Sequence, residues 1–131
     1  MRKPPMVAAA ALLGLWIVRP GPVAAQAQMA QPKGKEVVVT GTVVDVSCKF
    51  GQGLAGDEHR MCSQVCADKG IPLAILTDDG KLYLPTSAAM PGEPQNGRLK
   101  EFAERRVRVQ GKAFNAGGAY AIQIASITAA S

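Results

Sequence analysis

Aromatic residues, histidine and cysteine are all scarce in this chain of 131 residues. Only 5% of the residues are aromatic, one is a histidine and three are cysteines. Three cysteines cannot form a multi-bridge disulfide scaffold, and a single histidine with no nucleophile motif argues against a Ser-His-Asp hydrolase. The length suits one domain. This scarcity leaves four soft metal ligands, three thiols and one imidazole, whose spacing is informative.

The first residues have the features of an export signal. Two basic residues precede an apolar run over 6–18, which is too short to span a bilayer. Small residues follow this run, and we expect cleavage after Ala25 or Ala27. Residues 1–27 are therefore a predicted signal peptide. The sequence predicts a periplasmic or secreted protein with no membrane span after signal cleavage.

An excess of positive charge is also missing once this segment is removed. The formal net charge of the whole chain is +5, but three basic residues lie within the predicted signal, so the remainder carries +2. A balance so close to neutral predicts no nucleic-acid partner. The densest basic stretch, Arg105, Arg106 and Arg108, alternates with valine and favours the solvent-exposed face of a strand.

The rest of the chain has the pattern of one small β-rich domain. Residues 28–35 are a predicted flexible leader, and residues 36–128 the folded domain. Gly41 interrupts the first β-branched run and predicts a bulge or a sharp coil. Asp57 is the expected cap of an inserted helix. The pattern predicts strands over 36–48, 72–77, 81–84, 106–112 and 119–128, with a helix over 58–69 and a short helix beginning near residue 96.

This order of elements resembles that of the small exported bacterial OB-fold domains, which also begin with a valine-rich strand containing a glycine. The resemblance covers roughly residues 36–128. It implies a mainly β fold, a small five-stranded OB-like barrel with a helix inserted after strand one and a short helix before strand four. In OB barrels the connection between strands one and two helps to form the ligand face, so the inserted helix would lie there.

All three cysteines and the single histidine fall between positions 48 and 66. His59, Cys62 and Cys66 are three and four residues apart, which places them on one face of a helix. Cys48 ends the preceding strand and would close over that face. Three thiolates and one imidazole suit a tetrahedral zinc ion, and thiolate-rich sites also suit reduced copper. The sequence therefore predicts a zinc or copper ion held by Cys48, His59, Cys62 and Cys66.

The segment Cys62–Cys66 also resembles two copper-binding families. Its Cys-Ser-x-x-Cys string is similar to that of the binuclear copper site of cytochrome oxidase subunit II, and the same cysteine spacing resembles the exported copper chaperones of oxidase assembly. Both families place a histidine after the cysteine pair, whereas His59 precedes it. The resemblance therefore implies soft-metal binding and not electron transfer.

A disulfide is the alternative use of these cysteines, because exported cysteines usually pair. A bridge from Cys48 to Cys62 or Cys66 would attach the inserted helix to strand one, and closing a loop of about 15 residues stabilises by about 3 kcal/mol. The alternative prediction is a disulfide-stapled OB-like domain of the cell envelope, without metal, which binds an envelope partner or has a structural role. A catalytic thiol is less favoured because no residue in the sequence orients His59 as a base, so we predict no enzyme.

Overall fold

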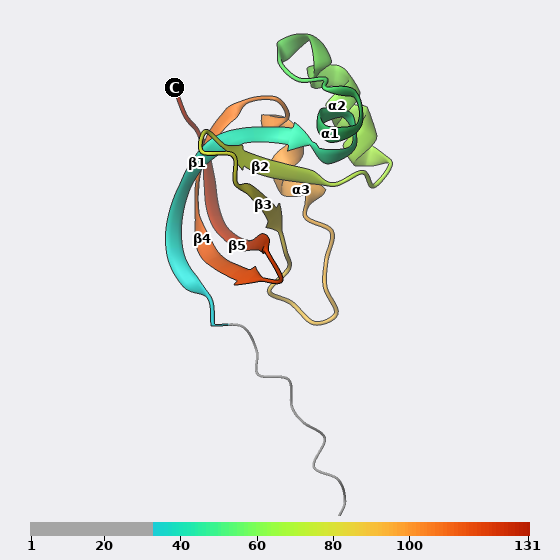
Figure 1. Cartoon of the computed structure of the whole chain (residues 1–131). Coiled ribbons are helices and arrows are strands. Elements are labelled where there is room, and N and C mark those ends of the chain that lie inside the picture. The colour runs from blue at the N-terminus through green and yellow to red at the C-terminus, as the bar shows by residue number, and fades with distance from the viewer. Residues whose placement is uncertain (1–32) are drawn as a thin grey trace, which may run out of the picture. The chain divides into compact units, whose positions relative to one another are not determined.

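The computed structural model describes residues 33–131, so the predicted signal peptide and most of the predicted leader lie outside the described residues. The described residues form a closed barrel with the strand order β1-β2-β3-β5-β4 (Figure 1). The predicted mainly β, five-stranded barrel is therefore confirmed. Its strands are β1 Lys35–Asp45, β2 Leu73–Thr77, β3 Leu82–Pro85, β4 Arg106–Ala116 and β5 Ala119–Ala129.

Strand β1 closes the barrel because it changes partner along its length. Residues 35–42 pair with β4, and residues 41–45 pair with β2. At the change, a Cβ atom on Gly41 would lie 2.5 Å from the carbonyl oxygen of Leu76. Only glycine permits this approach of the β2 backbone, so Gly41 provides the sharp coil that the sequence predicted as one of two options. A parallel pairing of β3 with β5 completes the closure.

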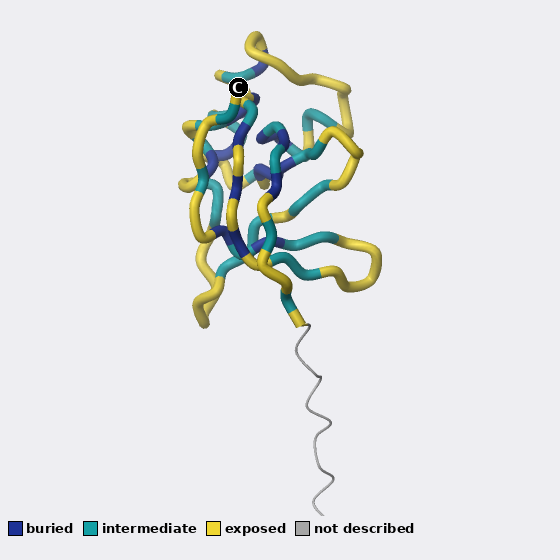
Figure 2. The backbone as a smooth tube through the Cα atoms, turned by 90° about the vertical axis from the view of Figure 1, so that its left-hand side faces the viewer, coloured by how far each residue is buried: buried dark blue, intermediate teal, exposed yellow. Residues whose placement is uncertain are grey.

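The core of the barrel is built from small aliphatic side chains. Buried and exposed residues alternate along the strands, as Figure 2 shows, because successive side chains of a strand point to opposite faces. Leu99, from the short helix α3 (Asn96–Leu99), is fully buried and belongs to this core. The other buried core members are Val39, Val43, Ala67, Leu73, Ile75, Val107, Val109, Ile122 and Ile124.

Helices lie in the two connections in which they were predicted, but the first connection also holds a helix that the sequence did not predict. Between β1 and β2 lie α1 (Val46–Gln52), the 3-10 turn η1 (Asp57–His59) and α2 (Arg60–Asp68), and α1 and α2 sit together in Figure 1. Between β3 and β4 lie α3 and the 3-10 turn η2 (Lys100–Phe102). No helix within residues 33–131 has the length and apolar character needed to cross a membrane.

The predicted boundary between strand one and its helix is wrong. The strand ends at Asp45 instead of residue 48, because the Asp45 side chain accepts a hydrogen bond from the backbone N–H of Cys48 and caps α1. Cys48 therefore belongs to a helix. Asp57 does not cap the second helix. It begins the turn η1, which Gly56 precedes, and the cap position of α2 itself is taken by His59 without a side-chain hydrogen bond.

Polar contacts fix the rotation of α2 about its own axis. The Arg60 guanidinium donates to the carbonyl oxygens of Glu101 (2.7 Å) and Ala103 (3.2 Å). Gln64 donates to the carbonyl oxygen of Lys100 at 3.2 Å, and Asp68 forms an ion pair with the Lys100 ammonium group at 2.6 Å. Residues four apart lie on one side of a helix. Arg60, Gln64 and Asp68 therefore form one row, here called the bonded row. The neighbouring row, His59, Ser63 and Ala67, is buried against the barrel.

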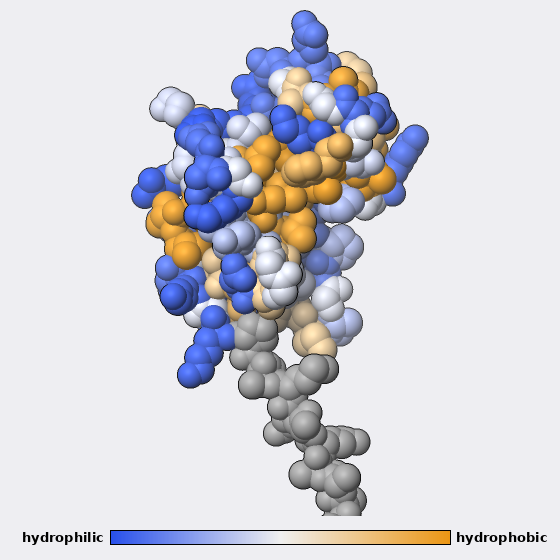
Figure 3. Space-filling model, viewed as in Figure 1, coloured by the Kyte–Doolittle hydropathy of each residue, from blue (hydrophilic) through white to orange (hydrophobic). Residues whose placement is uncertain are grey.

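Apolar residues also reach the surface. The space-filling view in Figure 3 shows them gathered across the middle of the face seen in Figure 1. Leu84, which is 38% exposed, lines a shallow hollow with Pro72 and Pro85. An exposed apolar face of this kind is a typical feature of surfaces that contact other molecules.

Candidate metal centre

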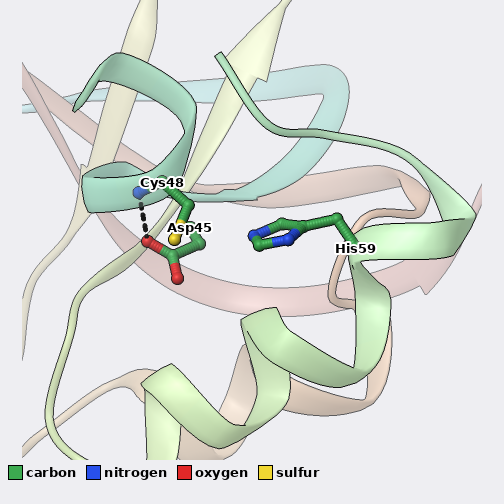
Figure 4. A group of neighbouring side chains, drawn as sticks. All are labelled: Asp45, Cys48 and His59. Carbon is green, nitrogen blue, oxygen red and sulfur yellow. Dashed lines mark hydrogen bonds between the residues drawn. The ribbon is translucent and has the colours of Figure 1, made fainter. Parts of the chain in front are cut away.

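Three potential ligands converge beside the end of β1. Asp45 is the last residue of β1, Cys48 lies in the first turn of α1, and His59 ends η1. A carboxylate oxygen, the thiol sulfur and an imidazole nitrogen of these residues all lie within 4.8 Å of one another. Figure 4 shows the imidazole ring pointing toward the Cys48 thiol and the Asp45 carboxylate. The chain thus brings a hard, a soft and an intermediate ligand to one place.

The polar atoms of this group are buried and incompletely bonded. Asp45 is fully buried, and His59 is 8% exposed. The Oδ1 atom of Asp45 accepts the N–H of Cys48 at 2.9 Å, but neither Oδ2 of Asp45 nor Nε2 of His59 has a hydrogen bond of regular geometry. A buried polar group without a partner costs about 1–3 kcal/mol. Two such atoms facing a thiol are an arrangement that a bound cation would satisfy.

The electrostatics of the group centre on the Asp45 carboxylate. Burial alone would raise the pKa of Asp45, but the Cys48 N–H and the Cys66 and Cys48 thiols outweigh burial and hold it below its usual value. The pKa of Cys66 rises to about 11, chiefly because its thiol donates toward Asp45 and also through burial. Burial, and then the charge of Asp45, raises the pKa of Cys48. At neutral pH one negative charge therefore lies beside two protonated thiols, whose protons a bound cation would displace.

The four residues predicted from the sequence fall into three environments. Cys48 and His59 belong to the converging group. Cys66 is half-buried and lies beside the Asp45 carboxylate, whereas Cys62 is exposed on α2. All three thiols are free. The bonded row of α2 explains this division, because it turns Ser63 toward the barrel and Cys62 away from it.

Sequence reasoning missed Asp45 as a potential ligand. A signal for it does exist, because Asp45 is the only acidic residue in the otherwise apolar and β-branched run over 37–46. An ionisable residue in a strand that is otherwise built for burial indicates a special role. Its second function as the cap of α1 also explains why it lies so close to Cys48, three residues further along.

Two more buried polar atoms lie along the contact between α2 and the barrel. The Oγ atom of Ser63 and the Oε1 atom of Glu104 have no hydrogen-bond partner, although Ser63 is fully buried and Glu104 is 6% exposed. Each unpartnered buried group in a native structure requires an explanation, and functional sites are one of the usual ones. The contact beneath η1 and α2 is therefore the most polar part of the interior described.

Comparison with known proteins assigns no family. No protein-family model, curated protein or solved structure significantly matches the chain. A function for this chain can therefore be proposed only from the chemistry of the barrel and of the group formed by Asp45, Cys48 and His59.

Proposed function

We propose that this domain binds one zinc or copper ion through Cys48 and His59, with Asp45 and Cys66 completing the ligand set. The observation that carries the proposal is a pair of buried atoms without a hydrogen bond of regular geometry, Oδ2 of Asp45 and Nε2 of His59, beside the Cys48 thiol. A tetrahedral ion would satisfy both atoms. Asp45 here replaces Cys62, which helical spacing had predicted as a ligand.

The ligand chemistry favours zinc. Zinc accepts carboxylate oxygen, imidazole nitrogen and thiolate sulfur together, whereas reduced copper prefers thiolate and thioether sulfur. The Asp45 carboxylate, fully buried in the proposed ligand set, is therefore a better partner for zinc. With four protein ligands the ion would have no open position, which is typical of structural or carrier sites rather than catalytic ones.

The setting of the site supports the rest of the proposal. The strand order β1-β2-β3-β5-β4 agrees with an OB-like barrel, and the site lies in the connection between β1 and β2, where such barrels bind ligands. We propose an exported module, periplasmic or secreted. Its function would be that of a metal carrier, an accessory protein or a metal-stapled domain of the cell envelope.

Metal titration of the reduced full chain tests the proposal. We expect one zinc per chain, and Co²⁺ as a replacement ion should show the absorption of thiolate ligation. Asp45→Asn retains an acceptor for the α1 cap but removes the charge, and should weaken binding by about tenfold or more. Cys48→Ser should weaken it similarly. Cys62→Ser is the matched control and should bind normally. Less than about 0.2 metal per chain, with zinc and with copper, would sink the proposal.

A second candidate is a disulfide-stapled barrel without metal. It is favoured by one observation, that the thiols of Cys48 and Cys66 lie together beside Asp45. Their oxidation would form one S–S bond and release two protons, with two electrons passing to a disulfide oxidant. The bridge would close a loop of about 19 residues, which stabilises by about 3 kcal/mol. In that case the apolar face around Leu84 would be the surface for an envelope partner.

Mass spectrometry separates the two candidates. In protein isolated without reductant, alkylation of Cys62 alone, together with a mass two hydrogens lower and no bound metal, would establish the disulfide between Cys48 and Cys66. Alkylation of Cys62 alone while metal is bound, and of all three cysteines after metal removal, would support the metal centre.

A further inference from the structure

Glu104 is a buried carboxylate on a backbone conformation that glutamate rarely adopts. Its φ angle is 59°, in the left-handed region where glycine and asparagine are the usual residues, and it is only 6% exposed. The turn that follows η2 imposes this conformation. The N–H of Glu104 donates to the carbonyl oxygen of Val43 at 2.8 Å, and the N–H of Arg105 donates to that of Phe102 at 2.9 Å. Glycine would suit this backbone better, so the reason for glutamate lies in its side chain.

The side chain of Glu104 contacts the segment that carries His59, 48 residues away in the chain. Its Oε2 atom accepts a hydrogen bond from the N–H of Gly56 at 2.9 Å. The carbonyl oxygen of Gly56 in turn accepts the N–H of His59 at 2.9 Å. A series of hydrogen bonds therefore runs from Val43, two residues before Asp45, through Glu104 and Gly56 to His59. It joins the two sides of the metal centre.

The segment that Glu104 holds is exposed and contains two glycines. Residues 53–56, here called the glycine loop, are all exposed, and both Gly53 and Gly56 have φ angles in the left-handed region. A Cβ atom on either glycine would contact nothing within 4 Å, so no neighbouring group packs against these two positions. Its start is tied to α1, where the N–H of Leu54 donates to the carbonyl oxygen of Cys48 at 3.1 Å. Its end is tied to the barrel by Glu104.

We propose that Glu104 is the latch of this loop. Its bond to Gly56 holds the glycine loop closed beside the centre, positions His59, and sets the rate at which a metal ion enters and leaves. Glu104 is a positioning residue and not a ligand, since its oxygens lie outside the group formed by Asp45, Cys48 and His59. This inference rests on the proposed function, because the ion is the one proposed there.

The side chain and the backbone of Glu104 can be tested separately. Glu104→Gly removes the latch but relieves the backbone, so the fold should persist, while zinc release to a chelator should become about tenfold faster or more. Glu104→Gln keeps an oxygen acceptor and should release zinc at close to the wild-type rate. In metal-free protein, the Gly56 amide should exchange its hydrogen faster in Glu104→Gly than in the wild type, and iodoacetamide should alkylate Cys48 faster.

The failures of the two proposals are distinguishable. Normal zinc uptake with an unchanged release rate in Glu104→Gly would overturn the latch and leave the metal centre in place. If the wild type takes up no zinc, the metal proposal fails, and Gly56 exchange that is equal in variant and wild type would overturn the latch as well. Should Glu104→Gly fail to fold, Glu104→Asp replaces it, because aspartate tolerates this backbone but is one methylene too short to reach Gly56.

Discussion

Ser63 carries an unsatisfied hydroxyl in the row of α2 that faces the barrel. It is fully buried, and its Oγ atom has no partner. Replacing it by alanine removes this hydroxyl and favours the helix, so Ser63→Ala should leave the free energy of unfolding unchanged or raise it by about 1 kcal/mol. Urea unfolding of the two proteins measures the difference. A loss of more than about 1 kcal/mol would instead show that a buried water bonds the hydroxyl in solution.

Among the individual residues of the site, the sequence predicts some ligands and misses others. Clustering alone identifies Cys48 and His59 as candidate ligands, because the soft ligands of a chain rarely fall so close together. It does not reveal which row of α2 faces the barrel. That rotation is set by Arg60 and Gln64, whose partners are backbone carbonyl oxygens about 40 residues away in the chain. Helical spacing cannot encode such partners, so the sequence did not reveal that Cys62 is exposed on α2.

Among the secondary-structure elements, two glycines allow a matched comparison, because one is closely approached by a neighbouring strand and the other faces open space. A Cβ atom on Gly111, at the β4 irregularity, would lie 2.2 Å from the carbonyl oxygen of Gln123, whereas one on Gly51 in α1 would meet nothing within 4 Å. Gly111→Ala should therefore destabilise by about 1–3 kcal/mol, and Gly51→Ala should stabilise by about 0.5–1 kcal/mol. Thermal unfolding of both variants is the measurement. Equal effects would contradict the tight approach of β5 at Gly111.

The orientation of α2 depends on Arg60. Removing its two bonds to the carbonyl oxygens of η2 and Ala103 in Arg60→Ala should destabilise by about 1 kcal/mol and also weaken zinc binding, because the neighbouring His59 shifts. Asp68→Asn breaks an exposed ion pair on the same row and should change stability by less than about 0.5 kcal/mol. Unfolding and zinc titration of both variants test this. Normal zinc affinity in Arg60→Ala would show that the row does not orient the site.

The strands were more predictable than the start of α1. Hairpin strands β2 and β3 follow from the glycine-containing turn over 78–80, and β4 and β5 from alternation. The end of β1 was missed because Val46 continues the β-branched run, while the residue that stops the strand is a cap whose partner is a backbone N–H. Caps of this kind compete with local strand propensity, and here the strand ends at Asp45, where the cap begins α1.

For the molecule as a whole, groups with shifted pKa values limit stability at both ends of the pH scale. On the acid side, hydrogen bonds and then the charge of Arg106 lower the pKa of Asp78, and hydrogen bonds from Lys81 and Thr77 lower that of Asp79 to about 2. Asp78 bonds to Arg106 of β4, and Asp79 bonds to Lys81 within the turn between β2 and β3. On the alkaline side, the raised pKa of Cys66 is the largest shift.

We therefore expect the reduced, metal-free chain to be most stable between the ordinary pKa values of aspartate, 3.8, and of the thiol, 9.0. Below 3.8 the unfolded carboxylates bind protons that the folded ones do not, so stability falls as the pH approaches about 2. Above 9.0 the folded Cys66 thiol keeps a proton that the unfolded thiol loses, so stability falls as the pH rises toward about 11. Urea midpoints across this range measure the profile. Asp79→Asn should flatten the acid limb, and Cys66→Ser should flatten the alkaline limb above 9.0. A Cys66→Ser profile that matches the wild type above 9.0 would contradict the contact between this thiol and Asp45.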